Sequence, residues 1–179
     1  MQPSLNNVGG LMRTKGYVGQ MSRLNEADIV DSLVSNDAIA VQFGACVGRD
    51  PNQPKCLRNA HVGDELLGPA VRDATPYHAA SDGTVSYAQY KSVPFVRLGF
   101  IYLFPVEAVS AGDGVVAIFD GSSGLFTGWG GTNGGVSSNR RLMRGYKWET
   151  TTPAFTSDTG QNPGEVSIGM SQGVNYITY

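Results

Sequence analysis

Residues 93–119 constrain the fold of this chain more than any other stretch. They contain two apolar runs, 93–104 and 114–119, that are rich in Val, Ile, Phe and Tyr. Branched and aromatic side chains pack well on a pleated, half-buried surface and therefore favour strands. Gly99 and Pro105 interrupt any helical period, and the Gly-Asp-Gly sequence between the runs is too flexible for a helix interior. We therefore expect a strand, a tight corner and a second strand at the centre of an all-β domain.

Turn residues divide the remainder of the chain into short β-prone segments. Gly, Pro, Asn and Asp recur between these segments, and the Asp-Gly pair at 82–83 is a strong hairpin signal. Many short strands at this spacing are typical of a sandwich, a jelly roll or a barrel. We predict an all-β chain with a compact jelly-roll-like or β-barrel body around one core. The further strands that we expect lie at residues 38–47, 66–71, 84–90 and 125–129, within residues 141–155, and at residues 166–179.

Residues 1–37 differ from the rest and predict an extended N-terminal arm in front of a β body at residues 38–179. They are rich in Asn, Gly, Ser and Met and show no sustained hydrophobic period. Asn25 precedes an apolar pattern with acidic residues in its first turn, which is a helix start signal, while an extended strand fits the same residues. An arm with so few core-forming residues gains little by folding on its own body. We expect it to become ordered against a neighbouring chain.

Charge and hydropathy argue against nucleic acid and membranes as the main partners. The chain has 13 Lys and Arg against 15 Asp and Glu, a net charge of -2, so it lacks the basic footprint of a nucleic-acid-binding protein. No apolar run reaches the roughly 18 residues of a membrane helix, and the N-terminus lacks the pattern of a secretory signal. Only 16% of the residues are charged, against about 25% in typical domains. We expect a protein that is made in the cytoplasm and covers much of its surface with partners.

Residue types that catalyse reactions or bind metals occur without the spacing that such chemistry requires. His61 and His78 have no Cys pair near them, and Asp113 and Asp120 lack the alternating oxygen ligands of a calcium loop. The Ser-Asp-Thr-Gly sequence at 157–160 has the residues of the aspartic protease triplet, but it lies in a turn and does not follow an apolar strand. We predict no catalytic residue, no cofactor and no metal site.

Two further patterns have an ordinary structural interpretation. Cys46 and Cys56 flank a loop and could close a disulfide across a hairpin, but a cytoplasmic chain favours two free thiols. The glycine-rich residues 128–135 lack the Gly-Lys-Ser or Gly-Lys-Thr ending of a phosphate-binding loop, so we expect a flexible surface loop there.

The chain has a single basic cluster, and Trp129 and Trp148 flank it in the sequence. A solvated face is one interpretation of the cluster, and docking on an acidic surface of a partner is the other. Exposed Trp beside Arg is the composition of interface hot spots, although core packing explains the two Trp equally well. The basic residues are Arg140, Arg141, Arg144 and Lys147.

The order and spacing of several segments resemble the phage structural cement proteins, the decoration proteins that bind over a finished capsid shell. The resemblance covers nearly the whole chain and departs from the family pattern around residues 49–56 and 127–143. The matching segments are GYVGQM and DIVDS in the arm, AIAVQFGACV, LLGPAVRD after a Gly-Asp turn, FVRLGFIYLF, EAVSAGDGVV, GLFTG and the β-rich C-terminus.

The resemblance implies a non-enzymatic virion protein with a compact β body and an extended N-terminal segment. Its expected place is the capsid exterior, after assembly in the host cytoplasm. It would decorate and stabilise a phage capsid by bridging subunits of the major capsid protein, beside neighbouring copies of itself in a homo-oligomer. Flexible arms and exposed strand edges suit such bridging. The residues that we expect to contact partners are Tyr17, Ile29, Trp129, Arg140, Arg141 and Arg144.

Two other function classes fit parts of the sequence. A phage tail or fibre component that binds a host surface glycan would use loops rich in Trp, Tyr and Asn, with Trp129 and Tyr146 as stacking residues. A small β-barrel hydrolase would use Asp158 as its nucleophile or base.

Overall fold

The computed structural model describes residues 18–23, 28–72, 86–154 and 163–169. Within these ranges the chain forms twelve strands and one short 3-10 helix, which confirms the predicted all-β class. The elements are β1 (Met21–Arg23), β2 (Ile29–Ser35), β3 (Val41–Gln42), β4 (Cys46–Arg49), β5 (Cys56–Asn59), β6 (Leu66–Pro69), β7 (Ser86–Tyr87), β8 (Ser92–Leu103), β9 (Gly114–Phe119), β10 (Phe126–Gly131), η1 (Thr132–Gly134), β11 (Arg140–Trp148) and β12 (Gly164–Ile168).

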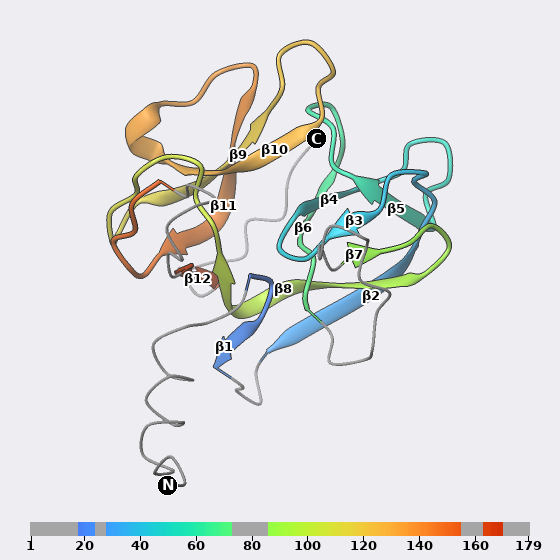
Figure 1. Cartoon of the computed structure of the whole chain (residues 1–179), viewed down its shortest axis with the longest axis horizontal. Coiled ribbons are helices and arrows are strands. Elements are labelled where there is room, and N and C mark those ends of the chain that lie inside the picture. The colour runs from blue at the N-terminus through green and yellow to red at the C-terminus, as the bar shows by residue number, and fades with distance from the viewer. Residues whose placement is uncertain (1–17, 24–27, 73–85, 155–162, 170–179) are drawn as a thin grey trace, which may run out of the picture.

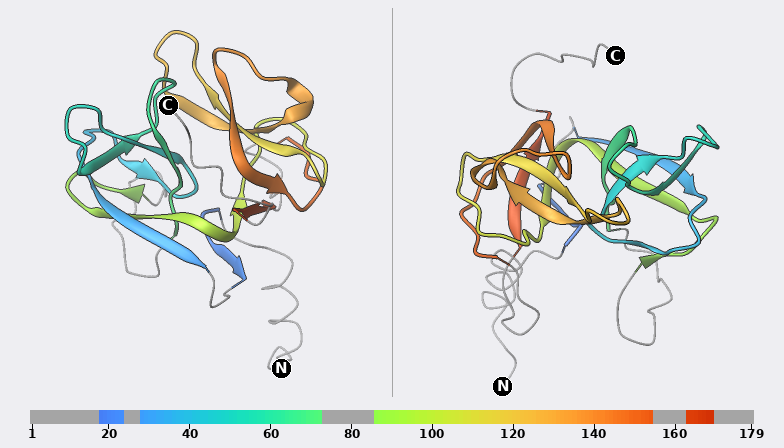
Figure 2. Two further views of the ribbon diagram at one scale, coloured as in Figure 1. Left: turned by 180° about the vertical axis from the view of Figure 1, so that it is seen from behind. Right: turned by 90° about the horizontal axis from the view of Figure 1, so that it is seen from above.

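Strand β8 runs through the middle of the molecule and connects two lobes (Figures 1 and 2). A continuous sheet has the strand order β10-β9-β11-β12-β8-β2-β5-β4-β6, and β1 pairs with β8 beside this path. Strands β3 and β7 form a separate two-stranded sheet. The first lobe contains β2 to β7, the second lobe contains β9 to β12, and both lobes use β8.

Both ends of the large sheet return to β8 or to the residues that follow it. After β6, Ala70 forms a bridge with Phe95 in β8. At the other end of the sheet, Trp129 in β10 forms a bridge with Pro105, just beyond the end of β8. Each lobe is therefore a small barrel-like sheet. This arrangement agrees with the barrel alternative for the predicted body.

An extra residue at Arg97 allows β8 to contribute to two cores. Adjacent residues of β2 lie opposite Leu98 and Val96, so Arg97 is left over in the pairing register. Such a bulge shifts the alternation of side chains along a strand by one residue. Val93 and Phe95, before the bulge, pack in the first hydrophobic cluster, whereas Ile101 and Leu103, beyond it, pack in the second.

The described residues contain two hydrophobic clusters, in place of the one core that we expected. The cluster of the first lobe is Val41, Val47, Leu57, Ala70, Tyr87, Val93 and Phe95. The other cluster is larger and extends from the second lobe into the first, since it includes Cys46, Ala60 and Val71. It is centred on Ile101, Leu103, Val115, Ala117, Phe119, Trp129, Trp148, Val166 and Ile168.

Strands β1 and β2 belong to the sheet, so the predicted boundary after residue 37 is not a boundary of the fold. Strand β2 pairs with β8 along almost its whole length. The strand alternative for the residues after Asn25 is correct and the helix alternative is wrong. The reason is a period of two: Leu33 and Ser35 face the first lobe, while Val30 and Val34 face outward. Residues 1–17 of the predicted arm lie outside the described residues.

Two other expectations need correction. The expected strand at 38–47 is divided into β3 and β4 by a turn at Gly44, whose φ of +73 and close contact with Val18 favour glycine. The connector between β8 and β9 is not a tight corner, because β9 lies between β10 and β11 and does not pair with β8. The predicted hairpin at 82–83 and most of the expected strand at 166–179 lie outside the described residues.

Cys46 and Cys56 are free thiols, in agreement with the alternative that we favoured. Burial raises the pKa of the Cys46 thiol above its ordinary value. Within the described ranges, no helix has both the length and the apolar character needed to cross a bilayer.

Gly68 allows β6 to approach β8 closely. Its φ is +144, a conformation that side chains with a Cβ rarely adopt, and a Cβ at this position would lie 2.5 Å from the carbonyl oxygen of Val96. The bridge that returns the sheet to β8 follows directly, at Ala70. Gly68 is therefore required for closing the first lobe.

Glycines in β10 allow the segment after β8 to lie against the second lobe. A Cβ at Gly128 would collide with Val106, and a Cβ at Gly130 would collide with Glu107. Glu107 accepts a hydrogen bond of 3.0 Å from Arg140 Nη1. The hydrogen bonds from Arg140 hold the pKa of Glu107 below its ordinary value. Much of the predicted flexible glycine loop is therefore a packed strand.

We expect Gly68→Ala to lower the free energy of unfolding by about 3 kcal/mol, because the new Cβ adds backbone strain and a collision with β8. Urea unfolding measures the change. Gly63→Ala is the matched control, since a Cβ there meets no atom within 4 Å, and its expected change is below about 0.5 kcal/mol. Equal stability of the two variants would contradict the role of Gly68.

We expect Glu107→Gln to cost about 1 kcal/mol at neutral pH. Because the folded-state pKa of Glu107 lies below the ordinary value of 4.5, the stabilisation is complete above about pH 4.5 and is lost as the pH falls through the folded-state pKa. Urea unfolding of both proteins from pH 7 to pH 3 should show their difference shrinking on acidification. A constant difference would show that the ionised carboxylate contributes nothing.

Candidate docking surface

The predicted basic cluster does not form a single charged surface. Arg140 forms an ion pair with Glu107, and its side chain is 17% exposed. Arg141 is partly buried and donates hydrogen bonds to backbone carbonyls. Arg144 and Lys147 are exposed on β11. Two of the three predicted contact arginines are thus engaged within the fold, and Arg144 lies at the surface.

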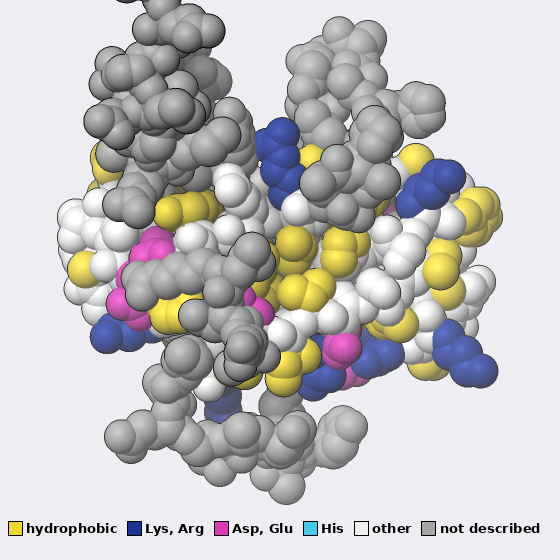
Figure 3. Space-filling view, turned by 90° about the horizontal axis from the view of Figure 1, so that it is seen from below, with side chains coloured by type: hydrophobic (Ala, Val, Ile, Leu, Met, Phe, Trp, Pro, Cys, Tyr) yellow, Lys and Arg dark blue, Asp and Glu magenta, His cyan; other side chains and the backbone are white. Residues whose placement is uncertain are grey.

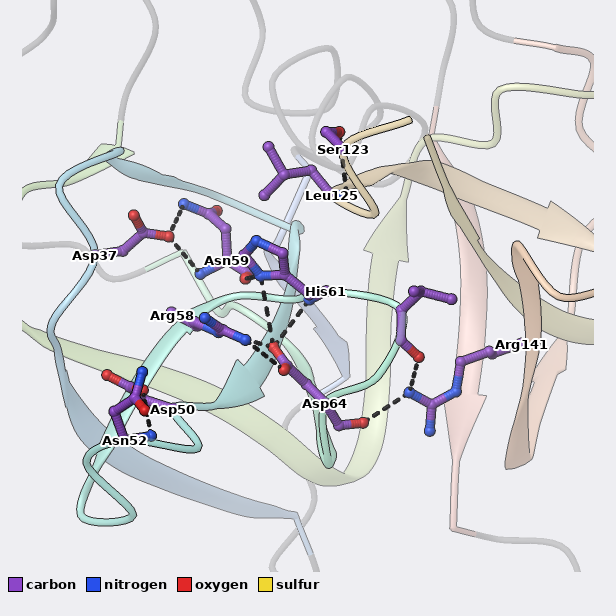
Figure 4. A network of polar contacts seen from close by, with 11 residues as sticks. Asp37, Asp50, Asn52, Arg58, Asn59, His61, Asp64, Ser123, Leu125 and Arg141 are labelled. Atoms are coloured by element: carbon purple, nitrogen blue, oxygen red, sulfur yellow. Dashed lines mark hydrogen bonds and ion pairs between the residues drawn. The ribbon is translucent and has the colours of Figure 1, made fainter. Parts of the chain in front are cut away.

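Arg141 ties the second lobe to a turn of the first lobe (Figure 4). Its Nη1 atom donates to the carbonyl oxygens of Val62 at 2.8 Å and Asp64 at 2.7 Å. The backbone of the same turn contacts the loop before β10, since the Val62 N–H donates to the Gly124 carbonyl at 2.8 Å. These contacts hold the two lobes together at a distance from β8.

Asp64 organises this turn from within. It is 7% exposed. Its carboxylate accepts hydrogen bonds from the Arg58 side chain at 2.7 and 3.0 Å and from the His61 N–H at 2.9 Å (Figure 4). The hydrogen bonds to Asp64 raise the pKa of Arg58. Asp64 is therefore a structural carboxylate whose charge is satisfied by its neighbours.

A shallow hollow of about 380 Å³ lies beside this network. Two ion pairs line it: Arg49 Nε lies 2.7 Å from Glu65, and Arg58 lies 2.7 Å from Asp64. In the described part of the chain, no three His, Cys, Asp or Glu side chains are grouped so that they could hold a metal ion. The hollow is lined by Arg49, Asp50, Pro51, Pro54, Arg58, His61, Gly63, Asp64 and Glu65.

Both tryptophans lie in the core, which contradicts the prediction that Trp129 contacts a partner. Trp129 is 3% exposed, and its indole N–H donates to the Gly44 carbonyl at 2.6 Å. Trp148 is fully buried and donates to the Gly130 carbonyl at 3.0 Å. Their N–H groups are satisfied by backbone carbonyls from distant segments, so each ring can be buried without an unpaired donor.

The stacking residues of the glycan-binding alternative are not available at the surface. Trp129 is buried, as described above. Tyr146 packs against the core of the second lobe, and burial raises the pKa of its hydroxyl. The structure therefore offers no support for a sugar-stacking platform at these two residues.

Five of the eight large hydrophobic side chains that are exposed in the described residues lie on or around β2. The exposed fractions are 50% for Ile29, 44% for Val30, 43% for Val34, 58% for Ile39 and 70% for Tyr90. Ile39 lies in the loop after β2, and the Tyr90 N–H donates to the Ser35 carbonyl at the end of β2. We call these five residues the β2 surface. Figure 3 shows hydrophobic side chains on the face of the molecule to which β2 and β8 belong.

Tyr90 combines exposure with an unusual backbone conformation. Its φ is +64, and it is the one described non-glycine residue with positive φ. A side chain with a Cβ adopts this conformation at a cost of about 1 kcal/mol. An exposed aromatic ring at such a position makes Tyr90 a candidate contact residue.

Sequence reasoning identified Ile29 on the β2 surface and missed its other members. The alternation in residues 29–35 was a usable signal, because apolar residues occur at positions facing both sides of the strand. Tyr90 has no comparable signal, because its exposure depends on how the turn before β8 folds. Tyr17, His78 and Asp158 lie outside the described residues.

Comparisons with known proteins agree with this architecture. The sequence matches the family model described as "Structural cement protein (E217 gp24/Pam3 gp6)" over residues 6–168. The fold is similar to a chain in the solved structure of the capsid of Myoviridae Phage XM1, with a TM-score of 0.61 and 16% sequence identity. That similarity covers 88% of this chain and 92% of the phage XM1 chain. A comparison with curated proteins found no match.

The similarity to the phage XM1 chain shows the fold alone at this level of identity. The match to the family model is the stronger evidence for family membership, because it spans most of the sequence, including every described strand. This chain therefore belongs to the phage structural cement protein family and is a structural protein of the phage virion.

Proposed function

We propose that this protein decorates and stabilises a phage capsid by bridging neighbouring subunits of the major capsid protein. It acts without catalysis on the exterior of the capsid, after assembly in the host cytoplasm. Neighbouring copies of the chain associate there as a homo-oligomer. Membership of the structural cement protein family supports this proposal.

The exposed β2 surface is the structural feature that best supports the proposal. Most of the large hydrophobic side chains that are exposed in the described residues lie there. Exposed apolar residues that gather on one face of a soluble protein mark an interaction site. The paired or buried state of Arg140, Arg141 and Trp129 leaves β2 as the better supported contact region. Arg144, and Tyr17 in the predicted arm, are proposed as additional contacts.

Shells assembled without this protein provide the direct test. We expect the purified full-length protein to co-sediment with expanded shells and to raise the temperature at which they break open, because each bound copy adds contacts between subunits. Differential scanning calorimetry of shells with and without the protein measures that temperature. Failure to bind, or binding that leaves shell stability unchanged, would contradict the proposed function.

We expect Tyr90→Gly to separate stability from binding. Glycine relieves the strained φ, so the free energy of unfolding should rise by about 1 kcal/mol. Loss of the ring should weaken shell binding at least fivefold, as for an aromatic interface residue. Val136→Gly is the matched control, because Val136 is 60% exposed and lies in the other lobe. If Tyr90→Gly binds as tightly as the control, Tyr90 is not a contact residue.

A further inference from the structure

One edge of β2 has no strand beside it over most of its length. On one side β2 pairs with β8 from Ile29 to Val34. On the other side β5 pairs only with Val34 and Ser35, through Cys56 and Leu57. Among the described strands, none pairs with residues 29–33 on that second side. This segment is called the open edge below.

The hydrogen-bonding pattern at the end of β2 identifies the backbone groups that face the open edge. The Ser35 N–H donates to the Lys91 carbonyl on the β8 side, and the Asn36 N–H donates to the Leu57 carbonyl on the β5 side. Successive residues of a strand direct their N–H and C=O groups to opposite edges. Val30 and Ser32 therefore direct theirs to the open edge.

The open edge is accessible and has few of the features that protect strand edges. Val30 is 44% exposed, and Ser32 is exposed as well. Natural sheets usually shield such an edge with Pro, Lys, a bulge or a covering segment, because unpaired N–H and C=O groups attract another strand. Residues 29–33 contain no Pro and no Lys, and the bulge at Arg97 lies on the opposite side of β2.

Charge on this segment favours a strand from a different protein over a second copy of this chain. Residues 28–33 carry Asp28 and Asp31 and no basic side chain. Antiparallel pairing of two copies about Asp31 would place the two Asp31 carboxylates directly opposite each other, which is destabilising. Arg97 lies 3.0 Å from Asp31, but it is supplied by β8 and belongs to the same copy. A neutral or basic partner strand avoids this repulsion.

We propose that the open edge of β2 binds an extended segment of the capsid subunit that carries a basic residue opposite Asp31. The inference rests on the proposed function and names the surface and the chemistry of the contact. The added strand would exchange backbone hydrogen bonds with Val30 and Ser32 and would place its own side chains beside the outward side chain of Val30. Backbone bonds would supply affinity, and the charge at Asp31 would select the register.

Ser32→Pro tests the backbone contact. Proline removes the N–H that faces the open edge and leaves the bonds to β8 in place, as tolerated at edge strands. We expect at least tenfold weaker binding to shells that lack the protein, with an unchanged unfolding midpoint. Ser32→Thr, which keeps the N–H, should bind like the unmodified protein. In hydrogen–deuterium exchange, the amides of Val30 and Ser32 should become protected on shell binding.

Asp31→Lys tests whether the negative charge of Asp31 contributes to binding. It also tests the role of the open edge if Ser32→Pro does not fold. The Asp31 side chain is 47% exposed, so the fold should tolerate the change. We expect at least tenfold weaker shell binding. Glu65→Lys is the matched control, because Glu65 is 58% exposed, also pairs with an Arg and lies away from β2. It should bind normally.

The outcomes separate this inference from the proposed function. If the unmodified protein binds shells and both Ser32→Pro and Asp31→Lys bind within twofold of it, the open edge is not the contact and the proposed function stands. If the unmodified protein does not bind shells, the proposed function fails first. If Ser32→Pro instead abolishes self-association of the free protein in sedimentation velocity, a second copy occupies the edge and the inference is overturned.

Discussion

The need of β8 to place apolar side chains in two different hydrophobic clusters controls this structure. A strand with Val, Phe, Ile and Leu on both sides must find apolar neighbours on both sides. The extra residue at Arg97 resolves this requirement, because Val93 and Phe95 before it pack in the first cluster, whereas Ile101 and Leu103 beyond it pack in the second. Two small barrel-like sheets on one shared strand follow from that arrangement. Gly68 permits one of them to close, and the glycines of β10 allow residues 106 and 107 to pack on the other.

The polar network of Asp64 and Arg141 adds a second connection between the lobes. Arg141 comes from β11, whereas its carbonyl partners lie in the turn before β6. Asp64 keeps that turn in shape through Arg58 and the His61 backbone. The charge-assisted contact of Arg141 acts together with the Trp129 hydrogen bond to Gly44 and the larger apolar cluster, and all of these oppose a twist of one lobe relative to the other. The relative position of the two lobes is thereby fixed by the fold.

Local patterns predicted the strands better than they predicted exposure. Residues 93–104 and 114–119 were recognised because uninterrupted β-branched and aromatic runs have one favourable local structure, and β8 and β9 match them within a residue or two. Trp129, Arg140 and Arg141 were misjudged because their surroundings are supplied by Gly44, Glu107 and Val62, from remote parts of the chain. The assignment of residues 29–35 to an arm failed for the same reason. Their inward residues became recognisable as core only once β8 was known to lie beside them.

The position of β8 in the chain has a consequence for the order of folding. Residues 28–72 supply most strands of the first lobe, yet that lobe lacks its closing strand until β8 has been synthesised. The second lobe also begins with β8 and is completed only by Gly164–Ile168. Pairing between such distant segments is slow to form and exposes strand edges in the meantime. More than half of the chain must therefore be synthesised before either barrel can close.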